Sequence, residues 1–367
     1  MEEGKNLGSS EIVKKREEWA DSLSDFSVSD VCYVSKAFAI ISVVFAHTSS
    51  YNNAYYEDIG ALIGLVGVPV FLIVSGFFLN LEVPRRKFWS AKVKRIIIPW
   101  IIWGLITYMI KIDLRFSDFS ANAILRWTIG YNTWLYYVPV MLICTAMCRV
   151  CHDRGLMVLI GISLLSWFGT YKEVILPPFL LPYVTNNMNA FNFLFLFVLG
   201  VMIRKAVDRN AAVVQWCIHF CGGGVFALTV CIGITIALGI LYVWSGRWIS
   251  YWGCLYSIPF ELMATIVVLQ LSILCRHSCL LKEIGKQTYF IYFFHMHLGM
   301  GILNRILFKY IPVNDFCEMI LLVSKPILIT VFSYAISRMI IYSAQKARLE
   351  KYLVYGGIMP IGEIVSK

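Results

Sequence analysis

A histidine near the end of an apolar run is the residue in this sequence best suited to chemistry. The run Ser35–Ser49 reads SKAFAIISVVFAHTS, and its histidine is His47. Ionisable side chains inside membrane spans are costly to place and usually serve a function. A neutral imidazole accepts a proton through its unprotonated nitrogen, which suits general-base work. The alternative is a packing role, with the ring hydrogen bonded to a backbone carbonyl.

Three other ionisable side chains within apolar segments are of interest. Glu261 lies in SIPFELMATIVVL, and His295 and His297 lie in IGKQTYFIYFFHMHL. Glu261 is a second catalytic candidate, because a carboxylate can orient an imidazole or balance its charge. Its alternative is a neutral carboxyl group bonded to a neighbouring helix. For His295 and His297 we expect a structural role, although His295 is kept as a candidate site residue.

Basic residues gather before the third apolar run, in RRKFWSAKVKRIIIPW. Within this segment Lys92 and Arg95 are three residues apart, so a helix would place them on one face. Such a pair suits a phosphate-bearing ligand, because the Arg guanidinium offers two parallel N–H donors. Charge alone also fits a topology signal or a contact with lipid headgroups.

The rest of the chain must hold these residues inside a membrane. Of its 367 residues 59% are hydrophobic and 15% are charged, whereas soluble domains contain about 25% charged residues. Apolar windows of about 20 residues can each cross a bilayer, and runs such as Val225–Val243 lack the alternation of a barrel strand. The predicted fold class is all-α, a polytopic integral membrane protein with about ten transmembrane helices. The expected spans lie near 31–48, 59–80, 94–111, 133–150, 155–170, 189–204, 223–244, 252–274, 287–307 and 318–343.

The formal net charge of +10 is distributed in a way that predicts orientation. Lys and Arg gather in every second loop, so the positive-inside rule places both termini in the cytosol, in agreement with an even number of spans. Because these residues flank apolar runs, we expect contact with membrane lipid and no nucleic-acid partner. The predicted domains are a polar cytosolic tail over 1–29, a transmembrane domain over 30–344 and a short cytosolic tail over 345–367.

Small and aromatic residues mark further positions. Ser75 and Gly76, in the second span, allow close approach between helices. Ser75 is a candidate site residue, as are Trp134, which opens the fourth span, and Tyr292 in the ninth. The 11 cysteines lie mostly inside spans and lack the paired spacing of zinc ligands, so no metal site is expected.

Several segments resemble, in order, the signatures of the acyltransferase 3 family of bacterial inner-membrane O-acyltransferases. They are DVCYVSKAFAIISVVFAH, FLIVSGFFL, FWSAKVKRIIIPW, TWLYYVPVML, FLFVLGVMI and IGKQTYFIYFFHMHL. The resemblance covers roughly residues 30–343 and is closest to the fucose 4-O-acetylase-like branch. It implies about ten helices, a cytosolic acyl-CoA donor and transfer of an acetyl group to a sugar hydroxyl.

The resemblance also implies roles for single residues. The family's first-span histidine falls on His47, and its basic R-x-x-R pair falls on Lys92 and Arg95, at the coenzyme A site. Here the first cation is Lys, which keeps the charge but lacks the planar guanidinium. No hydrolase-like domain follows the spans, so we expect direct acylation of the acceptor or its transfer to another chain. Acetyl-CoA is expected as a co-substrate, with no permanently bound cofactor.

The expected mechanism combines the chemistry of the residues with the roles that the resemblance implies. Coenzyme A phosphates bind the basic pair, helped by Lys36, Arg85 or Arg86, and the pantetheine arm passes between helices. His47 then activates the hydroxyl group of a sugar, a polysaccharide or a lipid-linked oligosaccharide, or takes the acetyl group transiently as an acyl-imidazole.

Two other functions fit a polytopic chain with intramembrane His and Glu. A proton-coupled transporter or flippase would use them as a proton relay, but the halves show no inverted repeat and no matching broken helices. The second alternative is a non-catalytic subunit of a polysaccharide export system. Neither alternative would transfer an acetyl group from acetyl-CoA. A homodimer is compatible with all three functions.

Overall fold

The computed structural model describes residues 28–48, 54–112, 120–131, 133–171, 189–209, 224–244, 257–311 and 314–348, which form helices and no strand. Among them, seven helical stretches are long and apolar enough to cross a membrane. They are Val28–Thr48, Tyr56–Phe77, Arg85–Lys111, Trp134–Cys151, Gly224–Trp244, Ser257–Leu274 and Asp315–Lys346. The predicted all-α, multi-pass class is thus confirmed, whereas the number ten stays a prediction. The predicted tails, 1–29 and 345–367, lie almost wholly outside the described residues.

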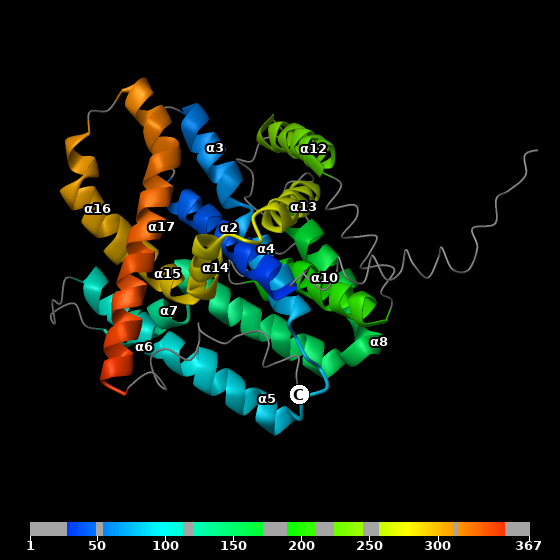
Figure 1. Ribbon diagram of the computed structural model, residues 1–367. Helices are drawn as coiled ribbons and strands as arrows, with labels where there is room; N and C mark the ends of the chain where they lie inside the picture. The colour runs from blue at the N-terminus through cyan, green and yellow to red at the C-terminus, as the bar shows by residue number, and fades with distance from the viewer. Residues whose placement is uncertain are drawn as a thin grey trace, which may run out of the picture.

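Helix α2 (Val28–Thr48) carries His47 and lies in the middle of the bundle, as Figure 1 shows. Ala37, Ala39 and Ile40 on this helix have no exposed surface. The helices packed against it include α3 (Ala54–Gly64), α4 (Gly67–Phe77), α13 (Ser257–Leu274), α14 (Cys279–Lys286) and α17 (Asp315–Lys346). A residue on α2 therefore faces protein rather than lipid on most sides.

The second expected span is divided between α3 and α4, with a turn at Leu65 and Val66. Pro69 explains the division, because it has no N–H for the carbonyl of Leu65 and its ring obstructs that position. Helix α3 nevertheless stays attached to α2, since the Ser42 hydroxyl donates to the Ile63 carbonyl at 2.5 Å. The turn at Leu65 lies beside the cavity described below.

The fourth and fifth expected spans both lie within α8 (Tyr137–Tyr171), which follows a short 3₁₀ turn, η3 (Trp134–Tyr136). The Cys144 thiol lies 3.7 Å from the Ala190 carbonyl oxygen, and the Ser163 hydroxyl donates to the Phe191 carbonyl at 2.5 Å. A straight helix would place Cys144 and Ser163 about 28 Å apart. Because both contact neighbouring residues of one helix, α8 bends sharply between them, and the two expected spans are separate segments that lie side by side.

Helix α10 (Ala190–Arg209), the sixth expected span, packs closely against α4 and α8. At its crossing with α4, a side chain on Gly76 would meet the Phe197 carbonyl, and one on Gly200 would meet the Ile73 carbonyl. Two backbones can approach this closely only where glycine faces backbone. The close approach predicted at Gly76 is confirmed.

The remaining helices include two π-helical segments. The third expected span, 94–111, corresponds to the π-helical η1 (Val93–Ile97) and α6 (Ile98–Lys111), and α5 (Arg85–Lys92) extends the helical stretch before it. The ninth consists of α15 (Thr288–Phe294), the π-helical η5 (His295–Met300) and α16 (Gly301–Ile306). Three further elements are α7 (Ala121–Thr128), α12 (Gly224–Trp244) and η6 (Phe308–Tyr310). Single-turn π segments inside α-helices occur frequently at functional sites.

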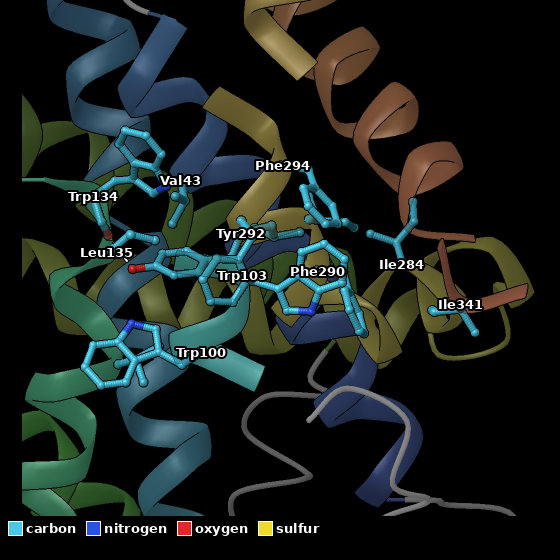
Figure 2. Packing of buried hydrophobic residues seen from close by; sticks show 14 of the residues in the cluster. Val43, Trp100, Trp103, Trp134, Leu135, Ile284, Phe290, Tyr292, Phe294 and Ile341 are labelled. Carbon is cyan, nitrogen blue, oxygen red and sulfur yellow. Dashed lines mark hydrogen bonds between the residues drawn. The ribbon is translucent and has the colours of Figure 1, made fainter. Parts of the chain in front are cut away.

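Aromatic side chains join α6 to α15. The Trp103 ring lies 5.0 Å from Phe294 and 6.0 Å from Phe290 between centroids, both edge to face. Figure 2 shows this packing of Trp103 with Phe290 and Phe294, next to Tyr292. The Tyr289 hydroxyl adds a hydrogen bond of 2.8 Å to the Ile96 carbonyl. These contacts fix α15 against the third span, on which the position of the site depends.

Candidate active site

A cavity of about 500 Å³ extends along α2. Its lining includes Lys36, Val43 and His47, which lie on one face of α2 because their spacing of seven and eleven residues nearly completes whole helical turns. From Lys36 to His47 the helix rises by about 16 Å. The remaining lining residues come from α3, α4, η1, η3, α8, α14 and α15 and the turns beside them. The cavity therefore joins a lysine end to a histidine end.

His47 belongs to the last turn of α2 and lines the cavity. Here α2 and α3 lie very close, because a side chain on Gly64 would overlap Ala46. The ring of His295 also lies close to His47, with the two centroids 5.2 Å apart at an interplanar angle of 40°. His47 thus faces a cavity on one side and a second imidazole on another, rather than bare hydrocarbon.

His295 is the first residue of the π-helical η5 and is only 1% exposed. Its Nδ1 is 2.7 Å from the carbonyl oxygen of Tyr292 and 3.2 Å from that of Ile291. Among the described residues its Nε2 has no hydrogen-bond partner. The sequence predicts a structural role for this residue, whereas the structure places it directly beside the candidate base.

Ser75, Trp134 and Tyr292 all line the cavity, as does Tyr137. The hydroxyl groups of Ser75 and Tyr137 are 3.2 Å apart, within hydrogen-bond distance. The Tyr292 hydroxyl donates to the Trp134 carbonyl, which attaches α15 to η3. The indole N–H of Trp134 is buried and has no acceptor among the described residues. The cavity lining thus includes these three hydroxyl groups and an indole among largely apolar side chains.

Two lysines, Lys36 and Lys286, line the other end of the cavity. Their ammonium nitrogens lie 5.2 and 5.8 Å from the ring centroid of Tyr33. Lys286 also contacts the Glu283 carboxylate at 2.7 Å, and this hydrogen bond raises the pKa of Lys286. Sequence reasoning named Lys36 but missed Lys286, although the segment IGKQTYFIYFFHMHL contains it.

The other predicted cations lie outside the cavity lining. Arg85 and Arg86 are exposed at the start of α5, and the Lys92 ammonium lies 5.5 Å from the ring centroid of Phe88. Lys92 ends α5 while Arg95 belongs to η1, so the pair does not share one regular α-helix. Ile96, which follows Arg95, does line the cavity. The basic pair is therefore adjacent to the lysine end without forming it.

Glu261 is buried on α13 and is 4% exposed. Of the described residues, none from α13 lines the cavity. The sequence suggested that Glu261 and His47 act together, but the structure does not bring them together in one cavity.

The cavity residues fall within one family match. A family model described as an acyltransferase domain, acyltransferase 3, matches residues 34–342, well over half of the chain. The chain belongs to this acyltransferase family. No curated protein and no solved structure matches it. Every residue that lines the cavity lies inside the matched range.

In this acyltransferase the third intramembrane histidine, His297, packs against the indoles of Trp127 and Trp134. Its ring stacks on Trp127 at 5.5 Å and meets Trp134 edge to face at 4.8 Å, both between centroids. The Lys111 ammonium lies 4.4 Å from the Trp127 ring centroid. These contacts give His297 a packing environment, whereas His295, two residues earlier, adjoins His47.

Proposed function

We propose that this membrane acyltransferase transfers an acetyl group from acetyl-CoA to a hydroxyl group of a cell-surface or lipid-linked sugar, as in the fucose 4-O-acetylase-like branch. The observation that carries the proposal is the cavity that joins Lys36 and Lys286 to His47. It suits a donor with an anionic end and a distant thioester. The proposed setting is a bacterial inner membrane, with ten spans and both termini in the cytosol.

In the proposed complex the lysine end holds the phosphate groups of coenzyme A. Two ammonium groups close to Tyr33 provide charge-assisted donors for phosphate oxygens. The basic pair Lys92 and Arg95, together with Arg85 and Arg86, then attracts the anionic donor toward this end, because clustered charge raises the local concentration of a counter-ion. The pantetheine arm follows the face of α2 toward His47.

At the histidine end the acceptor hydroxyl attacks the carbonyl carbon of the thioester. His47 takes the hydroxyl proton through its unprotonated nitrogen as the new C–O bond forms. The C–S bond breaks, and the coenzyme A thiolate leaves and receives that proton. In the hydrogen-bonded pair of Ser75 and Tyr137, one O–H is left to donate to the negative charge that develops on the carbonyl oxygen.

The first test uses purified protein, radiolabelled acetyl-CoA and methyl glycosides of fucose and other sugars as acceptors. We expect label on a glycoside with the wild type. General-base catalysis contributes roughly 10² to 10⁴ in rate, so His47→Ala should lower transfer by about that factor while the protein still purifies folded.

The matched control is His277→Ala, which removes an exposed histidine outside the cavity and should leave transfer unchanged. Undiminished transfer by His47→Ala would remove His47 from the mechanism. Absence of transfer to every acceptor by the wild type, with proton-coupled flux in liposomes, would favour a transporter instead.

A further inference from the structure

His295 is placed to act on His47 rather than on a substrate. It does not line the cavity, but its ring lies 5.2 Å from that of His47, which does. Two other rings, those of Tyr292 and Trp134, lie farther from it, at 6.2 and 6.3 Å. Trp134 itself faces the cavity. Of these three rings, that of His47 is therefore the closest to His295.

Backbone contacts determine which nitrogen of His295 carries the proton. Its Nδ1 lies 2.7 Å from the Tyr292 carbonyl oxygen, and a carbonyl oxygen can only accept a hydrogen bond. Nδ1 must therefore be the donor. In the neutral ring Nε2 then has a free lone pair and acts as an acceptor.

This acceptor is buried and unused. Nε2 of His295 has no partner among the described residues, and leaving a buried polar atom unpaired lowers stability. Nε2 of His297 is unpaired too, but the His297 ring stacks on Trp127, whereas the His295 ring lies beside that of His47. Catalytic hydrogen bonds are often long in the empty site and shorten only when substrate is bound.

We infer that His295 is a positioning residue for His47, with its Nε2 accepting the N–H of His47 so that the other nitrogen of His47 presents its lone pair to the cavity. The inference rests on the proposed function for its catalytic consequence. When His47 takes a proton from the acceptor, both of its nitrogens become donors, and the Nε2 acceptor stabilises the imidazolium. A base oriented by a third group is the arrangement found in other acyl-transfer sites.

The test compares His295→Leu, which removes the acceptor, with His295→Gln, which keeps an acceptor oxygen near the position of Nε2. His297→Leu is the matched control, because it removes an imidazole from the same π-helical segment outside the His47 contact. The first measurement is the rate at which diethyl pyrocarbonate modifies His47 in the purified protein, followed by mass spectrometry. This reagent acylates the unprotonated imidazole nitrogen and needs no sugar acceptor.

We expect modification of His47 to slow severalfold in His295→Leu, and to slow less in His295→Gln. In the acetyl-transfer assay His295→Leu should lower kcat by up to about 100-fold, because a misplaced base loses orientation, with the KM for acetyl-CoA nearly unchanged. Equal modification rates in His295→Leu and the wild type would overturn the inference. So would equal losses in His295→Leu and His295→Gln, which would indicate packing alone. If the wild type transfers no acetyl group but His295→Leu still slows modification, the proposed function fails and the positioning role stands.

Discussion

Lys286 shows how one side chain can serve both the resting protein and a ligand. Its ammonium is paired with Glu283, which also lies 3.6 Å from Arg338, and the Lys286 and Glu283 side chains are 40% and 38% exposed. Exposed pairs contribute only about 0–1 kcal/mol, so a phosphate group can replace Glu283 at small cost. Because the pKa of Lys286 is raised, its ion pair stabilises the protein fully below the ordinary lysine pKa and is lost only as pH rises through the raised value.

Removing this ammonium tests the proposed donor site. Lys286→Ala should raise the KM for acetyl-CoA about tenfold and leave kcat nearly unchanged, because one charge-assisted hydrogen bond contributes about 1.5 kcal/mol. The control is Lys282→Ala, since Lys282 pairs with Asp30 at 3.1 Å and does not line the cavity. A fall in kcat at saturating donor, with KM constant, would contradict a binding role for Lys286.

At the scale of elements, the contact between α14 and α2 places both lysines at one end of the cavity. A side chain on Gly285 would collide with the backbone carbonyl of Tyr33. Backbone cannot yield as a flexible side chain can, so only glycine permits this approach. The two helices therefore hold Lys286 and Lys36 together through a contact that involves neither lysine.

Gly285→Leu should separate these two helices. We expect a loss of about 1–3 kcal/mol or more in stability and a loss of acetyl transfer, because overpacking shifts backbone. Gly233→Leu makes the same change on α12, where a new side chain meets nothing within 4 Å, and should affect neither property. Thermal melting in detergent measures the stability of both variants, and the transfer assay measures their activity. Equal melting temperatures for the two variants would show that the α14–α2 contact is not required.

At the scale of the whole molecule, the bundle has an apolar outer surface and, among its inner helices, the cavity that His47 lines. Helix α12 exposes most of its apolar side chains, including Val225, Phe226 and Trp244, as expected for a helix in lipid. The cavity instead lies among α2, α4, α8 and α15, beside a core of packed aromatic side chains. In the proposed reaction, donor and acceptor meet in this cavity.

Blocking this route should stop the reaction without unfolding the protein. Val68 lines the cavity, and Val68→Trp would fill part of it, so transfer should fall at least tenfold while the protein still purifies as a single species. The same change at Val158, a 61% exposed residue of α8, adds an indole toward the outside and should be neutral. Normal transfer by Val68→Trp would mean that the donor does not use this cavity.

The sequence by itself determined the class of protein and named several residues that line the cavity. A bilayer requires each spanning segment to satisfy its own backbone hydrogen bonds, so apolar runs indicate helices without knowledge of their neighbours. The eleven-residue spacing of Lys36 and His47 likewise places both on one face of α2 from helical periodicity alone. Ser75, Trp134 and Tyr292 were candidates from the sequence, and the structure lines the cavity with all three.

Only the tertiary structure decided which helix faces meet. Lys286 rather than Lys92 and Arg95 lines the lysine end, because the Gly285 contact brings α14 against α2 while η1 interrupts the regular helix that carries the basic pair. His295 adjoins His47 because α15 and η5 pack against α2, a contact between segments far apart in the chain. Residue type and spacing record local preferences, whereas the rotation of one helix against another depends on contacts between residues far apart in the chain.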